Sequence, residues 1–162
     1  MAVPPKVLTL VLIRDLTKRR ILLGMKKRGF GKGRWNGFGG KVEVGETICD
    51  GARREVLEEC CLKLNEITKV GRLDFEFIGD PQILKVHVFQ ATEYHGNAEE
   101  TEEMRPRWFH ENEIPFSNMW PDDVMWFPLM LSGKKFYGYF KFKGHDDIVE
   151  HTISEVENLD DV

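Results

Sequence analysis

The sequence has no apolar run close to the roughly 20 residues that a membrane-spanning helix needs. Its first residues, Met1–Lys6, also lack the apolar stretch of a secretory signal. These two absences argue against a membrane anchor and against secretion. We therefore expect a cytoplasmic protein with no membrane partner, and we leave a mitochondrial or nuclear pool open.

Cysteine is scarce, and its three copies, Cys49, Cys60 and Cys61, fall within one short segment. An odd number of clustered cysteines provides no disulfide framework, and the spacing is not that of a zinc site. We expect all three to be reduced thiols, as in proteins of a reducing compartment.

Positive charge is in deficit overall, because the chain has a net charge of −4. A chain of this balance lacks the basic surface that nucleic acid requires, and we expect no stable nucleic-acid complex. Residues 26–41 are the exception, with no acidic residue and with the basic residues Lys26, Lys27, Arg28, Lys32, Arg34 and Lys41. Such a loop suggests a small polyanion as ligand; a merely solubilising loop is the alternative.

The 162 residues suit a single domain over 1–162, with a core at about 7–156 and a flexible acidic tail at 157–162. Nothing in the sequence demands a partner chain, so we expect a monomer. Apolar alternation and β-branched runs predict strands, and longer amphipathic stretches predict helices, at 47–60 and 122–131. The predicted strands are 7–13, 21–26, 69–78, 86–91, 107–109 and 136–142. This order indicates an α/β (α+β) fold, such as an α/β/α sandwich with a central mixed sheet.

The first predicted helix carries Glu55, Glu58 and Glu59 at positions i, i+3 and i+4. Three like charges so close on one helix repel one another, which a helix built only for stability would avoid. On a helical wheel, Glu55 and Glu59 also share a side with apolar residues. Carboxylates near a core need a compensating charge, which either arginines or a metal could supply. An oxygen-only ligand set favours Mg²⁺, with Mn²⁺ as an alternative.

A glycine-rich loop with basic residues, 29–40, comes shortly before this helix. Glycine lets backbone approach a ligand closely, and free N–H groups at a helix N-terminus attract phosphate. Metal, basic side chains and amides around one point would form a polyphosphate site. Its chemistry would be metal-assisted displacement at phosphorus.

The segment from Gly40 to Leu62 reads GKVEVGETICDGARREVLEECCL and resembles the signature of the Nudix hydrolase family. The resemblance implies the Nudix α/β/α fold and a metal site. Cys61 departs from the pattern, which has glycine there, and should cost local stability. The implied catalytic residues are Arg54, Glu55, Glu58 and Glu59, with Arg54 holding the glutamates and Glu59 activating water. The implied metal ligands are the Gly39 backbone, Glu55, Glu58 and Glu59.

Several side chains outside the signature could read a purine base. Trp120, Phe75 and Phe77 could sandwich the ring, although aromatic residues on an alternating strand more often belong to the core. Asn36 can both donate and accept hydrogen bonds. Asp122 and the adjacent Asp123 could cap a helix, but in a dry pocket one of them would keep a proton and could donate.

Most of the chain resembles those Nudix hydrolases that act on oxidised purine nucleoside triphosphates. That resemblance implies Mg²⁺-dependent hydrolysis of 8-oxo-dGTP and 2-hydroxy-dATP to the monophosphate and pyrophosphate, with Glu103 as a further metal ligand. The implied substrate contacts are Thr9, Lys26, Asn36, Phe38, Gly39, Gly40, Lys41, Phe75, Trp120, Pro121, Asp122 and Asp123. The alternatives are a Nudix hydrolase of a methylated purine nucleotide, a dinucleotide polyphosphate or a cap, and a nucleotide-binding module without turnover.

Overall fold

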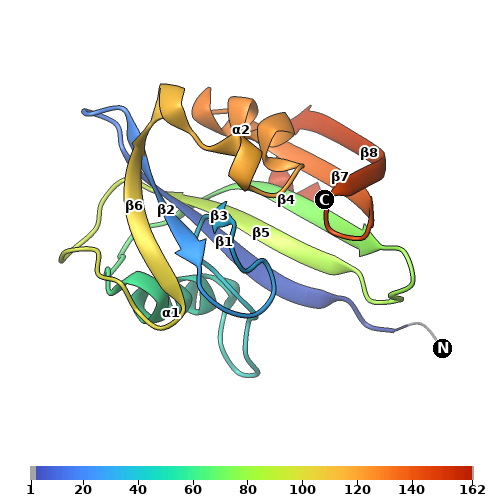
Figure 1. Ribbon diagram of the computed structural model, residues 1–162, viewed down its shortest axis with the longest axis horizontal. Helices are drawn as coiled ribbons and strands as arrows, with labels where there is room; N and C mark the ends of the chain where they lie inside the picture. The colour runs from blue at the N-terminus through green and yellow to red at the C-terminus, as the bar shows by residue number, and fades with distance from the viewer. Residues whose placement is uncertain (1–2, 162) are drawn as a thin grey trace.

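The computed structural model describes residues 3–161 and shows one eight-stranded mixed sheet between two helices (Figure 1). In Figure 1, α1 lies below the sheet and α2 above it. The strands are β1 (Lys6–Asp15), β2 (Arg20–Lys26), β3 (Trp35–Asn36), β4 (Thr68–Phe77), β5 (Leu84–Ala91), β6 (Met104–His110), β7 (Lys135–Lys143) and β8 (Asp147–Val156). The helices are α1 (Ile48–Cys60) and α2 (Asp123–Leu131), with short 3-10 turns at Glu111–Glu113, Phe116–Asn118 and Leu159–Asp161. The predicted α/β sandwich with a central mixed sheet is confirmed.

The strand order is β3-β2-β1-β5-β4-β7-β8, and β6 pairs with the other side of β2. β1 runs parallel to β5 and β4 runs parallel to β7, whereas the remaining pairs are antiparallel. β1 therefore lies in the middle of the sheet. Burial on both faces explains why its sequence is an almost continuous apolar run.

Side-chain alternation along β1 divides the core into two layers. Leu12 packs on the α2 side with Trp126 and Phe127. Its neighbour Val11 packs on the α1 side in the same cluster as Ala52 and Val56 of the helix. One strand thus supplies both cores, which fixes α1 and α2 on opposite faces of the sheet.

Three strand predictions were incomplete. β8 was missed because it is an edge strand whose side chains are mostly exposed and polar, so it has little apolar alternation. β3 is only two residues long and lies inside the stretch that we predicted as a glycine loop. β6 begins at Met104, before the predicted start at 107, because its exposed arginines interrupt the apolar pattern.

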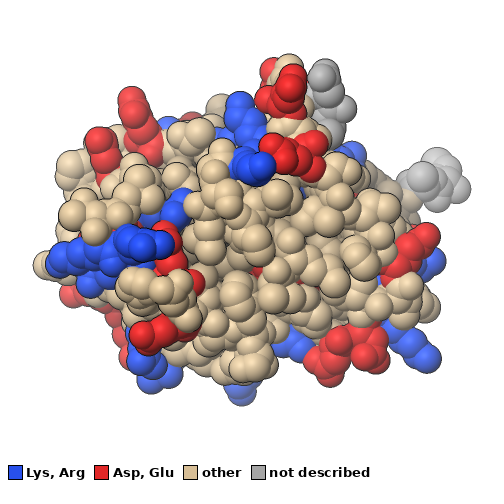
Figure 2. Space-filling view, turned by 90° about the horizontal axis from the view of Figure 1, so that it is seen from above, with Lys and Arg blue, Asp and Glu red and all other residues tan. Residues whose placement is uncertain are grey.

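One residue of the predicted flexible tail, Leu159, packs on the fold, whereas Glu157, Asn158 and Asp160 are exposed. Leu159–Asp161 form a 3-10 turn in which Leu159 is buried, whereas residue 162 lies outside the described residues. Within 3–161, neither helix has the length and apolar character that crossing a bilayer requires. Viewed from the α2 side, uncharged side chains cover most of the centre of the molecule, and basic and acidic groups mark its margins (Figure 2).

Candidate active site

Helix α1 begins and ends with recognisable caps. The Thr47 hydroxyl accepts a hydrogen bond from the backbone N–H of Asp50 at 3.1 Å, which satisfies one free donor of the first turn. At the other end Cys61 has a φ of 67°, in the left-handed region that favours glycine. The expected strain at Cys61 is therefore present, at a cost of about 1 kcal/mol for a residue with a Cβ atom.

The three glutamates of α1 have different surroundings. Glu59 is 4 % exposed, and its Oε1 accepts a hydrogen bond of 2.8 Å from the backbone N–H of Gly39. Burial raises the pKa of Glu59 to about 8, despite the Gly39 hydrogen bond and the charge of Lys26, which lower it. Glu55 is half-buried and burial also raises its pKa, whereas Glu58 is exposed. The predicted placement of Glu55 and Glu59 on the core side is confirmed.

Arg54 lies at the centre of one group of carboxylates. Its Nε and Nη2 donate to the two oxygens of Glu46 at 3.0 and 2.8 Å. Its Nη1 donates to Glu55 at 3.0 Å and to Glu58 at 3.2 Å. The Arg54 hydrogen bonds lower the pKa of Glu46 to about 2. A single guanidinium thus contacts three carboxylates, and it holds Glu46 in its ionised form.

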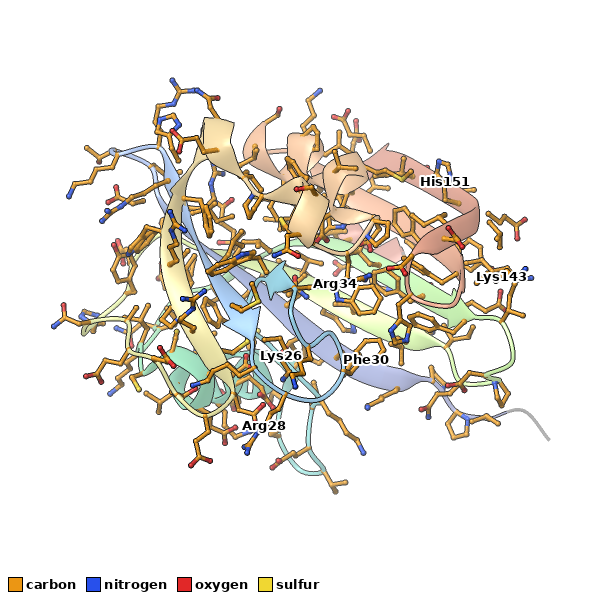
Figure 3. The ribbon with its side chains drawn as sticks, viewed as in Figure 1. Lys26, Arg28, Phe30, Arg34, Lys143 and His151 are labelled. Atoms are coloured by element: carbon orange, nitrogen blue, oxygen red, sulfur yellow. The ribbon has the colours of Figure 1, made fainter. Side chains whose placement is uncertain are left out.

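Lys26 lies between the other two carboxylates that were predicted to bind metal. Its Nζ is 3.1 Å from Glu103 and 4.0 Å from Glu59. Arg28 Nε also donates to Glu103 at 2.7 Å, and this hydrogen bond, followed by that of Lys26, lowers the pKa of Glu103. In Figure 3, Lys26 and Arg28 lie on the side of their loop toward α1, and Arg34 lies on the side toward α2. The pairing of β2 with β6 brings Glu103 to this position.

The residues fit a hard divalent cation by their chemistry, since every predicted donor is an oxygen. Gly40 leaves room for the Glu55 carboxyl, because a Cβ atom there would lie 2.6 Å from its carbon. A Cβ atom on Gly39 would lie only 1.9 Å from the carbonyl oxygen of Thr9. Over residues 3–161, however, no three acidic, histidine or cysteine side chains already surround a common point that could hold a metal. The compensating charges in this structure are those of arginine and lysine, and metal binding stays a prediction.

A cavity of about 670 Å³ lies against the sheet on the α2 side and extends to Glu59. Most of the predicted substrate contacts line it, namely Thr9, Lys26, Asn36, Gly39, Gly40, Lys41, Phe75, Trp120, Asp122 and Asp123. Two do not. The Phe38 side chain is fully buried in the core on the α1 side, since it faces away from the cavity where its backbone pairs with Val11. Pro121 is half-buried and lies outside the cavity lining.

Asp122 and Asp123 form a buried acid pair in this cavity, with exposures of 2 % and 3 %. Trp126 Nε1 donates to Asp122 Oδ2 at 2.9 Å, while Asp122 Oδ1 and Asp123 Oδ2 have no hydrogen-bond partner among residues 3–161. Burial raises the pKa of Asp122 to about 6, and burial together with the charge of Asp122 raises that of Asp123 well above its usual range. The pair can therefore carry a proton at neutral pH, so that it offers a donor as well as acceptors.

The surroundings of Trp120 differ from those predicted. Phe75 lines the cavity but stacks on Phe140 at a centroid distance of 5.9 Å, so it belongs largely to the core. The ring stacked on Trp120 is that of Phe30, at 5.0 Å and an interplanar angle of 28°. Phe30 belongs to the loop that the sequence predicted to contact the ligand, but it was not singled out as the aromatic partner of Trp120. Sequence reasoning missed His145, because β8 and the turn before it were not predicted.

Comparisons with known proteins agree with this geometry. A family model described as NUDIX domain matches residues 4–130. A Danio rerio protein named oxidized purine nucleoside triphosphate hydrolase is 58 % identical, over 95 % of this chain and 97 % of that protein. A Mus musculus protein of the same name is 56 % identical, over 93 % and 96 %. Among solved structures, the mMutator MutT protein from Bacillus halodurans has a TM-score of 0.81 at 23 % identity, over 92 % of this chain and 97 % of that one. The last likeness is one of fold.

Proposed function

The chain belongs to the Nudix family, and we propose that it hydrolyses oxidised purine nucleoside triphosphates such as 8-oxo-dGTP and 2-hydroxy-dATP. The products are the nucleoside monophosphate and pyrophosphate, so that the reaction clears damaged nucleotides from the pool. One observation carries the proposal: Glu59 and Lys26 line the same cavity as the buried acid pair and Trp120. The printed names of the two relatives support the same substrate class.

The triphosphate would lie beside Lys26, Lys41 and the backbone of Gly39 and Gly40, where positive charge and close backbone approach coincide. The Gly39 backbone and the carboxylates Glu55, Glu58, Glu59 and Glu103 would hold Mg²⁺, or Mn²⁺ in its place. Such an ion, when bound, neutralises charge that develops on the phosphates. Its arrival would require Lys26 and Arg54 to share their present carboxylate partners.

Hydrolysis forms one bond from a water oxygen to phosphorus and breaks one P–O–P bond, which releases pyrophosphate. The proton of the water needs an acceptor, and we assign this role to Glu59. Burial makes this carboxylate a stronger base than an exposed one, and the Gly39 N–H fixes the position of one of its oxygens. Arg54 holds Glu55 and Glu58 in place and does not touch the reacting atoms in this scheme.

The purine would lie between Trp120 and Asn36, with its edge toward Asp122 and Asp123. The Asn36 side-chain oxygen accepts a hydrogen bond from the Gly37 N–H at 2.8 Å, which orients the amide. A proton on the acid pair lets it donate to an oxo group and accept from an amino group. This explains how a single pocket could accept purines whose edges carry different hydrogen-bond patterns.

We also propose that the chain acts as a monomer in the cytoplasm, and we leave a mitochondrial or nuclear pool open. It would act on free nucleotides and would form no stable complex with nucleic acid or membranes. The net charge of −4 supports this proposal, since nucleic acid and anionic lipid both require basic surface.

A substrate panel with purified protein and Mg²⁺ tests the proposal. We expect kcat/KM for 8-oxo-dGTP and 2-hydroxy-dATP to exceed those for dGTP, methylated purine nucleotides, dinucleotide polyphosphates and capped RNA. Equal values for dGTP and 8-oxo-dGTP would contradict the substrate assignment. If no nucleotide releases pyrophosphate or phosphate, the chain is a binding module without turnover.

A further inference from the structure

Arg34 connects three segments that are distant in the sequence. Its Nη1 donates to the carbonyl oxygen of His145 at 2.9 Å, and its Nη2 pairs with the carboxylate of Asp146 in the β7–β8 turn. Its guanidinium carbon also lies 4.3 Å from the ring centroid of Trp120, before α2. The Arg34 side chain thus ties the loop after β2 to the β7–β8 turn across a cavity residue.

The loop that carries Arg34 is shaped to lie against Trp120. Gly29, Gly31 and Gly33 have φ values of 77°, 83° and 86°, which residues with a Cβ atom rarely adopt. A Cβ atom on Gly31 would lie 3.2 Å from Nε1 of Trp120. A side chain at this position would therefore require the indole to shift by a few tenths of an ångström.

The contacts of Arg34 differ in strength because their burial differs. The Arg34 side chain is 20 % exposed, whereas that of Asp146 is 83 % exposed. An ion pair with so exposed a partner contributes little by itself. A guanidinium close to an indole is favourable, and more so when water is largely excluded. The Trp120 contact therefore dominates, and the contacts with the β7–β8 turn hold the guanidinium in position over the ring.

We propose that Arg34 is a positioning residue, which fixes the indole of Trp120 and thereby sets the affinity of the cavity for the purine ring. The inference rests on the proposed function, because it assumes that the base stacks on the Trp120 indole, on which Phe30 is stacked in this structure. Arg34 acts through Trp120: its carbonyl oxygen accepts a hydrogen bond from the Lys26 N–H at 3.1 Å, but its side chain lies on the opposite side of the loop from that of Lys26 (Figure 3). Its loss should therefore weaken binding of the base and leave the rate of the chemical step almost unaltered.

Four variants separate this role from a structural one. Arg34→Ala removes all three contacts, Arg34→Lys keeps the charge without the planar fork, and Asp146→Asn removes only the ion pair. Arg107→Ala is the matched control, because Arg107 lies 5.1 Å from the Phe109 centroid and outside the cavity lining. For each variant we would measure kcat and KM for 8-oxo-dGTP, the Kd for 8-oxo-dGMP by tryptophan fluorescence, and the melting temperature.

We expect Arg34→Ala to raise KM and the 8-oxo-dGMP Kd about tenfold, with kcat changed by less than about twofold. Arg34→Lys should lie between Arg34→Ala and wild type, and Asp146→Asn should raise Kd about twofold. Arg107→Ala should leave KM and Kd at their wild-type values.

A wild-type Kd for folded Arg34→Ala would overturn the inference, and so would a loss of kcat with unaltered KM. If Arg34→Ala does not fold, wild-type Kd values for both Arg34→Lys and Asp146→Asn overturn it instead. Wild-type protein that binds 8-oxo-dGMP but releases no pyrophosphate from 8-oxo-dGTP would contradict the proposed function alone. The Kd series would still decide the role of Arg34.

Discussion

The molecule has two groups of carboxylates, which differ in what surrounds them; the second, Asp122 and Asp123, lines the cavity, which extends to Glu59 of α1. Glu46, Glu55 and Glu58 share Arg54, and Glu103 shares Lys26 and Arg28. Asp122 and Asp123 are buried with an indole N–H as their side-chain donor. Hydrogen bonds from a guanidinium lower the pKa of Glu46 to about 2, whereas burial raises that of Asp122 to about 6.

The difference shows how one residue type serves two tasks. Glu46 and Glu103, which accept hydrogen bonds from cations, have lowered pKa values and stay ionised, as metal binding requires. A buried pair keeps a proton and can read hydrogen-bond donors and acceptors. Glu59 belongs to the first group by its place in α1 and to the second by its burial, and burial raises its pKa to about 8. A general base requires both a position beside the substrate phosphates and a raised pKa. A substitution of Glu59 therefore tests the difference between the two groups most directly.

The largest expected effect is that of Glu59→Gln. The amide oxygen can still accept from the Gly39 N–H, so the fold and nucleotide binding should persist. Loss of the proton acceptor should lower kcat by about 10³-fold, within the usual range for a general base. Steady-state kinetics with 8-oxo-dGTP and a binding titration with 8-oxo-dGMP would separate the two effects. An unaltered kcat would remove Glu59 from the mechanism.

Asp122→Asn, in the second group of carboxylates, should have the next largest effect, which is on binding of the base. We expect KM for 8-oxo-dGTP to rise about tenfold, with an unaltered Mg²⁺ dependence, because a buried hydrogen bond to the base is mispaired. Trp126 Nε1 can still donate to the asparagine oxygen, so the fold should be retained. Wild-type discrimination against dGTP in this variant would mean that the base is read elsewhere.

The same variant gives a pH test with a definite sign. The pKa of Asp122 in the folded protein is about 6, above its ordinary value of 3.8. Its contribution to stability is therefore fully present below the ordinary value and is lost as pH rises through about 6. Asp122→Asn should unfold at higher urea concentration than wild type at pH about 8, and at a similar concentration at pH about 4. If Asp122→Asn instead unfolds at a lower urea concentration than wild type at pH about 8, the ionised Asp122 carboxylate is stabilised by its neighbours.

Asn36→Ala should have a smaller effect, which also concerns binding of the base. Its amide contributes a neutral hydrogen bond to the base, so we expect KM to rise about fivefold without a change in kcat. The Gly37 N–H loses its side-chain acceptor, which should lower the melting temperature slightly. Kinetics with 8-oxo-dGTP and dGTP side by side would test this, and equal losses for both substrates would deny Asn36 a role in discrimination.

Cys61→Gly should have the smallest effect, which is on stability, because Cys61 lies at the C-terminal end of α1. Relief of the left-handed strain at a φ of 67° should stabilise the protein. We expect about 1 kcal/mol, or a rise of about 2–4 °C in melting temperature, with kcat/KM unaltered. Cys61→Ala retains the Cβ atom and is the matched control, which should show no such gain. Equal melting temperatures for the two variants would place the strain elsewhere.

Local patterns were sufficient where the physical cause is local. The core-facing side of Glu55 and Glu59 follows from their spacing along a helix, and the strain at Cys61 follows from its position at the end of that helix. β1 and both helices could be predicted for the same reason, since their burial dictates their apolar pattern. β8 could not, because an exposed edge strand has no such pattern, and His145 in the turn before it was missed as a consequence.

The sequence alone determined the chemistry that is available: the glutamates at helical spacing, the glycines before them and the adjacent aspartates. Only the tertiary structure decided how each group is charged. Arg54 and Glu46 are eight residues apart, but Lys26 meets Glu103 and Arg34 meets Asp146 across more than 70 residues. In the folded protein the Phe38 side chain packs in the core, and the Phe30 ring stacks on that of Trp120. A pKa depends on solvent and on neighbours in space, and only the packed sheet determines both.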